Sequence, residues 1–194
     1  MEKPKDFDTA RASGEYEPLP AGGYVCRIIG VDETLSKTGK KMVKIAVDIA
    51  EGAEAGRFME SYKSNANDFK KWPASATMYQ LTEDNEGNTH GRFKHFTNCV
   101  EASNNGFEIV WGNEFGACFK GKLVGVIFGR EQYKSQRDGS LKWTTRAQYF
   151  KTVNDIRNGE FKVPEDKPLT EEKAGNTAGI PSGFAKVEDE DIPF

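Results

Sequence analysis

Two pairs of strand-like segments, each joined by a short glycine-containing turn, constrain the fold of this chain more than any other feature. In the first pair, residues 24–34 are rich in β-branched side chains, and residues 42–49 alternate between apolar and polar side chains. In the second pair, residues 121–133 and 141–150 flank a turn that contains Asp-Gly. Such pairs are typical of β-hairpins, which predicts two antiparallel ribbons.

The segments between the two hairpins complete the expected fold. Residues 57–62 follow Gly56 and are interpreted as a third strand, whereas residues 92–102 carry apolar side chains at helical spacing. Three strands, a helix and a two-stranded ribbon, in that order, are typical of an OB-fold, a five-stranded, partly open barrel. We therefore expect a mainly all-β protein, a five-stranded OB-fold barrel with a short helical insert. Three glycines are expected where its strands bend; they are Gly30, Gly125 and Gly129.

Composition divides the chain into three parts. Residues 1–22 show no sustained period and are expected to form a flexible N-terminal arm, and residues 23–158 are expected to form the folded domain. Residues 159–194 hold nine acidic and four basic side chains, a net charge of −5, with few large apolar residues. Because such a segment buries too little apolar surface to offset its ordering entropy, a disordered acidic tail is predicted. The other 158 residues carry a net charge of +2.

Composition also narrows the class of protein. No apolar run approaches the roughly 18 residues of a membrane span, and the first residues show no apolar signal region, so we expect neither a membrane protein nor an exported one. The three cysteines are far apart in the sequence and odd in number, which favours a reducing cytoplasm over a disulfide framework.

We find no enzyme motif in the sequence. The chain lacks a nucleophile elbow, a phosphate-binding loop and a dinucleotide fingerprint, and neither histidine has zinc-ligand spacing to a cysteine. We therefore expect a protein that is not an enzyme and uses no metal or cofactor.

Cations and aromatic side chains, in contrast, occur together along both predicted hairpins. Proteins that bind single strands without reading the sequence need cations for phosphates and flat rings for bases. The turns of the hairpins correspond to two loops that contact ligands in OB-folds. The expected phosphate-neutralising cations are Lys40, Lys41, Lys44, Arg130, Arg137, Lys142 and Arg146. The expected stacking rings are Tyr133 and Trp143 on the second hairpin, and Trp72, which follows two lysines in the segment between the hairpins.

Ordinary structural roles compete with this interpretation. Aromatic side chains of barrels often belong to the core, and turn lysines often serve solubility or block edge pairing. The last strand can also present only one of two alternating sets to a ligand. One set is Lys142, Thr144, Arg146 and Gln148, and the other is Trp143, Thr145, Ala147 and Tyr149.

The C-terminal sequence carries the sharpest motif. Four consecutive acids run into Ile192, Pro193 and Phe194. An aromatic ring beside a terminal carboxylate can enter an apolar pocket with a basic rim, while the proline limits the conformations lost on binding. The predicted partner-binding residues are Asp189, Glu190, Asp191, Ile192, Pro193 and Phe194.

This motif, Glu188-Asp-Glu-Asp-Ile-Pro-Phe194, resembles the acidic tip of bacterial single-stranded DNA-binding proteins, which ends in Asp-Asp-Ile-Pro-Phe; only Glu190 departs from its acids. The body resembles phage-encoded single-stranded DNA-binding proteins of OB-fold type, through residues 24–28, 121–133 and 156–164. The resemblance implies a protein of the host bacterium's cytoplasm that coats exposed DNA strands during phage replication or recombination. It also implies a tip that docks host or phage replication proteins. A homo-oligomer is possible.

Two other classes of function stay open. The near-neutral body is compatible with an OB-fold that binds another protein of the replication machinery and does not itself bind DNA. A nuclease built on an OB platform would need a cluster of acidic and histidine ligands for a metal, which the sequence does not suggest.

Overall fold

The structure is a computed structural model that describes residues 3, 5, 18–136 and 138–169. Its five strands are β1 (Gly22–Leu35), β2 (Lys41–Ile49), β3 (Thr77–Leu81), β4 (Leu123–Lys134) and β5 (Leu141–Lys151). Its helices are α1 (Arg57–Ser64), the 3-10 turn η1 (Ala74–Ala76), α2 (Gly91–Ser103), α3 (Phe115–Cys118) and α4 (Val153–Asn158).

The strands form one antiparallel sheet in the order β3-β2-β1-β4-β5. Both predicted hairpins are confirmed: β1 pairs with β2, and β4 pairs with β5. The sheet is open, because the described residues form no hydrogen-bonded ladder between β3 and β5. A mainly β protein with a five-stranded sheet is thus confirmed, whereas the predicted OB-fold barrel is not, because the sheet is not closed.

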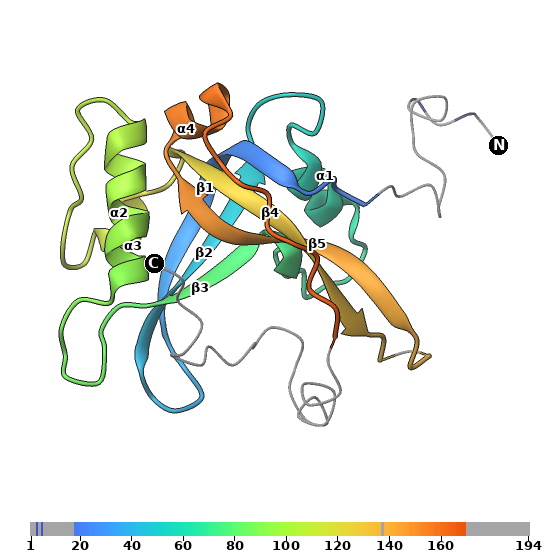
Figure 1. Ribbon diagram of the computed structural model, residues 1–194, viewed down its shortest axis with the longest axis horizontal. Helices are drawn as coiled ribbons and strands as arrows, with labels where there is room; N and C mark the ends of the chain where they lie inside the picture. Colours follow the sequence, from blue (N-terminus) through green and yellow to red (C-terminus); the bar gives the residue numbers. More distant parts are fainter. Residues whose placement is uncertain (1–2, 4, 6–17, 137, 170–194) are drawn as a thin grey trace.

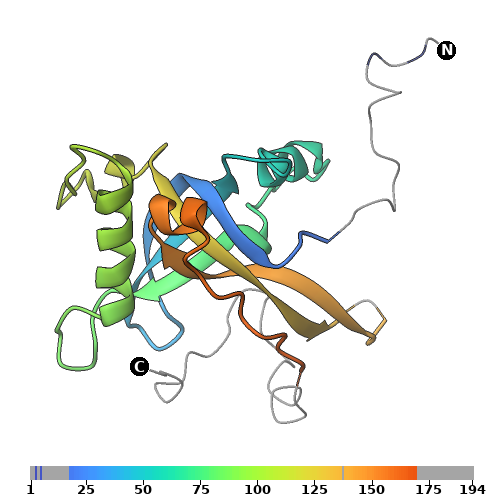
Figure 2. The same ribbon diagram turned by 45° about the horizontal axis from the view of Figure 1, so that its top comes forward.

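The outer half of the β4–β5 hairpin projects from the body of the molecule. β1 pairs with β4 only as far as Phe128, and beyond that point β4 and β5 continue as a two-stranded ribbon. Figures 1 and 2 show this ribbon extending to one side, opposite the end where α2 lies. Toward its end the ribbon is exposed, and Arg130, Tyr133 and Trp143 lie in this part.

The predicted third strand at residues 57–62 is wrong, because these residues begin α1. Gly56 enters the helix with a φ of +80°, and the buried Asp48 carboxylate accepts a hydrogen bond from the Phe58 amide in its first turn. The third strand is β3, where Met78 and Gln80 are the buried positions. A buried glutamine interrupts the apolar alternation by which strands are found.

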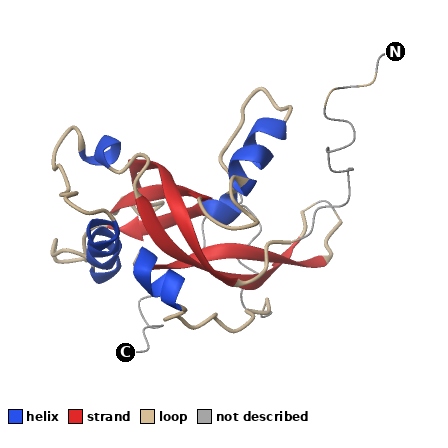
Figure 3. Ribbon diagram, turned by 90° about the horizontal axis from the view of Figure 1, so that it is seen from above, coloured by secondary structure: helices blue, strands red, loops and turns tan. Residues whose placement is uncertain are grey.

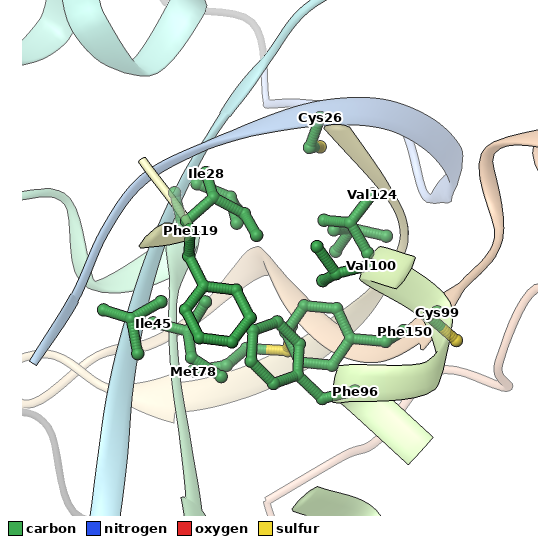
Figure 4. Packing of buried hydrophobic residues seen from close by; sticks show 14 of the residues in the cluster. Cys26, Ile28, Ile45, Met78, Phe96, Cys99, Val100, Phe119, Val124 and Phe150 are labelled. Atoms are coloured by element: carbon green, nitrogen blue, oxygen red, sulfur yellow. The ribbon is translucent and has the colours of Figure 1, made fainter. Parts of the chain in front are cut away.

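The predicted helix at residues 92–102 is confirmed as α2. It packs Phe93, Phe96 and Val100 against one face of the sheet. Figure 3 shows the helices arranged around the curved sheet. Figure 4 shows Phe96 facing Phe119 and Phe150 within the core, with ring centroids 5.3 and 4.6 Å away. In the described part of the chain, no helix is long and apolar enough to cross a membrane.

Segments that flank the sheet in sequence are also held on it. Leu19 is buried, and its carbonyl oxygen accepts a hydrogen bond of 2.6 Å from the Thr145 hydroxyl on β5. At the other end, α4 begins with a capping box between Thr152 and Asp155 and ends at Gly159, whose φ is +73°. The chain then runs back along the ribbon (Figure 1).

Candidate nucleic-acid interface

The ribbon presents different side chains on its two faces. Residues directly opposite each other in an antiparallel pair share a face, and Gln132 lies opposite Trp143, whereas Tyr133 lies opposite Lys142. The face with Trp143 also carries Arg130 and continues inward into the core through Phe128. We call it the Trp143 face, and the opposite side the Tyr133 face.

Arg130 and Trp143 form the most defined pair on the ribbon. The guanidinium carbon of Arg130 lies over the indole ring, 5.0 Å from its centroid. Trp143 remains 38% exposed. A guanidinium above an aromatic ring gains cation–π attraction and keeps its remaining N–H groups free for an acceptor. Here the acceptor is the Asp166 carboxylate, 3.0 Å from Arg130 Nη1.

The Tyr133 face carries two further predicted cations. Arg146 donates to the Glu131 carboxylate at 2.7 Å, and Lys142 lies 3.1 Å from Asp138 in the turn. Hydrogen bonds from the Ser140 hydroxyl, with further contributions from Ser135 and Lys142, hold the pKa of Asp138 well below its ordinary value. Asp138 is therefore an anion at neutral pH. Tyr133 itself is 44% exposed.

A bulge between β4 and β5 places Tyr149 and Trp143 on opposite faces, although alternation along the sequence predicts that they share one. The register of β4 and β5 shifts between Ile127 and Phe128, so Tyr149 pairs with Ile127 whereas Ala147 pairs with Phe128. Tyr149 consequently lies on the Tyr133 face, although it is an even number of residues from Trp143. Thr145 is buried and belongs to the structural contact with Leu19.

A short segment after α4 is fixed to the ribbon; we call residues 166–169 the strap. Lys167 forms a parallel bridge with Glu131: its amide donates to the Arg130 carbonyl at 3.0 Å, and its carbonyl accepts from the Gln132 amide at 2.8 Å. The Leu169 amide donates to Gln132 Oε1 at 3.2 Å. The strap thus occupies the edge of β4 that β1 leaves unpaired.

The three predicted lysines of the first hairpin lie apart from the ribbon. Lys41 pairs with Glu83 at 2.9 Å, and Lys44 approaches Asp32 at 3.7 Å. Within the described residues, the Lys40 ammonium makes no ion pair. Figure 1 shows this hairpin and the ribbon reaching toward different sides of the molecule. An extended strand that contacts both would have to cross the body between them.

Trp72 packs against the body of the protein and is not an exposed ring on the ribbon. Its Nε1 donates to the Val47 carbonyl at 3.1 Å, and its ring lies tilted against Tyr62 with centroids 5.6 Å apart. The side chain is half-buried against the core. It is not brought together with any of the ribbon cations.

The structure therefore gathers five of the predicted site residues on the ribbon: Arg130, Tyr133, Lys142, Trp143 and Arg146. Arg137 and the tip residues Asp189, Glu190, Asp191, Ile192, Pro193 and Phe194 lie outside the described residues.

Sequence reasoning missed three residues at exposed positions. Trp111 is 67% exposed, and its ring stacks on Phe115 with centroids 5.3 Å apart. Asp166 and Lys167 of the strap contact the ribbon, and the Lys167 ammonium lies 6.0 Å from the Tyr149 ring centroid. A tryptophan before a glycine, in a segment that the sequence assigns to neither helix nor strand, was the available signal for the first, whereas the strap has none.

Other chemistry in the described residues is limited. Cys99 Sγ lies 3.5 Å from His95 Nε2, but the same nitrogen is 3.0 Å from the Phe150 carbonyl oxygen, which can only accept a hydrogen bond. His95 Nε2 therefore carries hydrogen and cannot take the thiol proton. Burial raises the pKa of Cys99 to about 11. No group of three or more His, Cys, Asp or Glu side chains gathers among these residues to hold a metal.

Comparison with known proteins identifies a family for this chain. None of the curated proteins matches the chain in sequence. A family model described as "Protein of unknown function (DUF669)" matches residues 5–105, just over half of the chain. The matched region includes β1, β2, β3 and α2, and it ends before the ribbon begins. On this match, the chain belongs to the DUF669 family.

Proposed function

We propose that this protein binds single-stranded DNA through the ribbon and adjoining surfaces, without catalysing a reaction on it. The observation that carries the proposal is the Arg130 guanidinium 5.0 Å above the exposed Trp143 ring. A single strand exposes bases that can stack on a ring and phosphates that need a cation, and this pair supplies both within one nucleotide's reach.

The arrangement of the strands supports an OB-type fold for this function. A five-stranded OB barrel has the strand order β3-β2-β1-β4-β5, with a helix between β3 and β4, and is closed by pairing of β3 with β5; we call the line between these two strands the seam. At that seam, β5 contacts η1 and β3 without pairing with them. The ribbon then corresponds to the loop between strands four and five, which contacts ligands in such folds.

Ion pairs on the ribbon set the expected strength of binding. Arg130, Lys142 and Arg146 each face a carboxylate in the free protein. Because exposed ion pairs contribute only about 0–1 kcal/mol each, phosphates can replace the carboxylates at Arg130 and Lys142 at small cost. The Arg146–Glu131 pair is partly buried and is held more firmly. The same pairs favour the second candidate, a module that binds another protein, since they leave the ribbon less positive than its lysines and arginines suggest.

Titration of a fluorescent oligo-dT and a matched duplex tests the proposal at low ionic strength. The single strand is expected to bind more tightly, and its affinity should fall as salt is added because phosphate neutralisation releases counterions. Trp143→Ala should cost about 1–3 kcal/mol of binding free energy, the usual value of one stacked base. No retention of oligo-dT by the wild type would leave the protein-binding module as the better candidate.

Two variants away from the ribbon serve as matched controls. Arg92 is an exposed arginine on α2, and Trp111 is an exposed tryptophan in the loop before α3. Arg130→Gln is expected to weaken binding about threefold to tenfold through the lost phosphate contact, whereas Arg92→Gln and Trp111→Ala should change it little. If Arg92→Gln weakened binding as much as Arg130→Gln, or Trp111→Ala as much as Trp143→Ala, the result would argue against a site on the ribbon.

The recruitment of phage or host replication proteins is proposed for the C-terminal tip, on the strength of its sequence. Deleting residues 188–194 is expected to abolish capture of such a partner and to raise DNA affinity slightly, because four negative charges are removed. Phe194→Ala separates the two effects, since it keeps the acids and removes the ring. Capture that survives both changes would remove the tip from the proposal.

A further inference from the structure

The strap places a carboxylate on Arg130, the cation that lies over the exposed Trp143 ring. Asp166 Oδ2 lies 3.0 Å from Arg130 Nη1, and both side chains are close to half exposed. A carboxylate and a phosphate offer the same kind of oxygen to a guanidinium. The position on Arg130 that suits a phosphate is therefore filled by the protein itself.

The backbone of the strap explains why Asp166 stays there. The next residue, Lys167, is hydrogen bonded through both its amide and its carbonyl to β4, and Leu169 is tied to the Gln132 side chain. Residues on either side of a bridged position point to the opposite face, so Asp166 projects toward the Trp143 face while Lys167 projects toward Tyr149. The strap thus holds one acid in a fixed place beside Arg130.

We infer that the strap is an internal competitor: Asp166 occupies the phosphate position at Arg130 in the free protein, and a bound strand displaces it. This inference rests on the proposed function and adds its regulation. Because binding and displacement are coupled, whatever holds the strap on β4 weakens nucleic-acid binding, and a bound strand loosens the strap by the same factor.

A pair of isosteric variants in the full-length chain tests the inference. Asp166→Asn removes the competing charge, and Glu165→Gln removes the same charge one residue earlier, where the described chain shows no contact of the side chain. Asp166→Asn should raise oligo-dT affinity about twofold to fivefold, the range expected from releasing one exposed ion pair. Glu165→Gln should give a smaller rise that reflects net charge alone.

The same substitutions in an Arg130→Gln background separate competition at Arg130 from general electrostatics. With the arginine removed, the gain from Asp166→Asn should shrink to that of Glu165→Gln, because the two residues act on one contact. Equal gains for the two acids in the wild-type background, or a gain from Asp166→Asn that persists without Arg130, would overturn the inference.

Hydrogen exchange gives an independent measurement on the unmodified protein. The amides of Lys167 and Gln132 make the two bonds of the bridge, so both should exchange faster when oligo-dT is bound. Faster exchange supports displacement, and unchanged or slower exchange at both amides contradicts it. If neither the wild type nor Asp166→Asn binds oligo-dT, the proposed function fails and this inference fails with it; binding by both with equal affinity removes the inference alone.

Discussion

The side-chain amide of Asn104 pairs with both backbone groups of Leu123. Its Oδ1 accepts from the Leu123 amide at 2.9 Å, and its Nδ2 donates to the Leu123 carbonyl at 2.8 Å. The same Nδ2 is 2.7 Å from the Val100 carbonyl near the end of α2. One side chain therefore replaces a missing strand neighbour at the start of β4 and joins that strand to the helix.

Asn104→Ala is expected to lower the free energy of unfolding by about 2–4 kcal/mol, because it leaves partly buried backbone groups of Leu123 and Val100 without partners. Urea denaturation followed by circular dichroism measures the loss. Asn105→Ala, at the exposed neighbouring position, is the control and should change stability by less than about 0.5 kcal/mol. Similar values for the two variants would contradict the role assigned to Asn104.

The sequence predicts an element well when residues within that element decide its structure, and poorly when a contact with a residue far along the chain decides it. The two hairpins follow from local alternation and turn residues, and both are present. In contrast, residues 57–62 are too short to distinguish strand from helix, and the buried Asp48 carboxylate that contacts the Phe58 amide is ten positions away. Contacts of this kind are invisible to a periodic pattern.

The candidate site was predictable in its residue types and less so in its geometry. Alternation along β5 cannot reveal the bulge that moves Tyr149 to the face opposite Trp143. The ion pair between Arg130 and Asp166 joins residues 36 positions apart. The glycines on β4 were expected at bends, yet a Cβ at Gly125 would lie 2.6 Å from the Thr152 carbonyl oxygen, so close packing of the chain that enters α4 requires that one.

Gly116 of α3 is a second position where close packing excludes a side chain. A Cβ there would lie 2.3 Å from the Val31 carbonyl oxygen on β1, well inside contact distance. Gly116→Ala should therefore cost about 1–3 kcal/mol of stability, because helix and strand must separate. Gly91→Ala begins α2 with open space around the new methyl group, and it should leave stability unchanged or raise it by up to about 1 kcal/mol. Thermal and urea unfolding measure the change in stability of each variant relative to the wild type. The two changes should differ in sign, or that of Gly116→Ala should be clearly the larger.

Asp48 predicts a pH dependence of stability. Burial raises the pKa of its carboxyl above the ordinary value of 3.8, although hydrogen bonds from the Phe58, Met59 and Ile49 amides oppose the shift. The folded state then holds the proton more tightly than the unfolded state, so the contribution of Asp48 is most favourable below 3.8 and is lost as pH rises through the folded-state pKa.

The comparison of wild type with Asp48→Asn isolates this contribution. The free energy of unfolding of the wild type, minus that of Asp48→Asn, should fall as pH is raised from about 4 toward 7. Glu33→Gln, an exposed acid on β1, is the control variant. A difference that rises with pH would mean that the amide hydrogen bonds outweigh burial at this carboxylate.

The three cysteines predict a single accessible thiol in the native protein. Cys26 and Cys99 are buried, and burial raises the pKa of both thiols, that of Cys99 to about 11. Cys118 is partly exposed, with its thiol donating to the Phe115 carbonyl at 3.0 Å. Because the thiolate is the reactive form and needs access to the reagent, a colorimetric thiol reagent at pH 8 should modify about one cysteine per chain quickly and the other two only after unfolding. Cys118→Ser should remove the fast phase. A fast phase that remains in that variant would show that the packing around α2 opens in the native state and exposes Cys99, or that β1 does the same for Cys26.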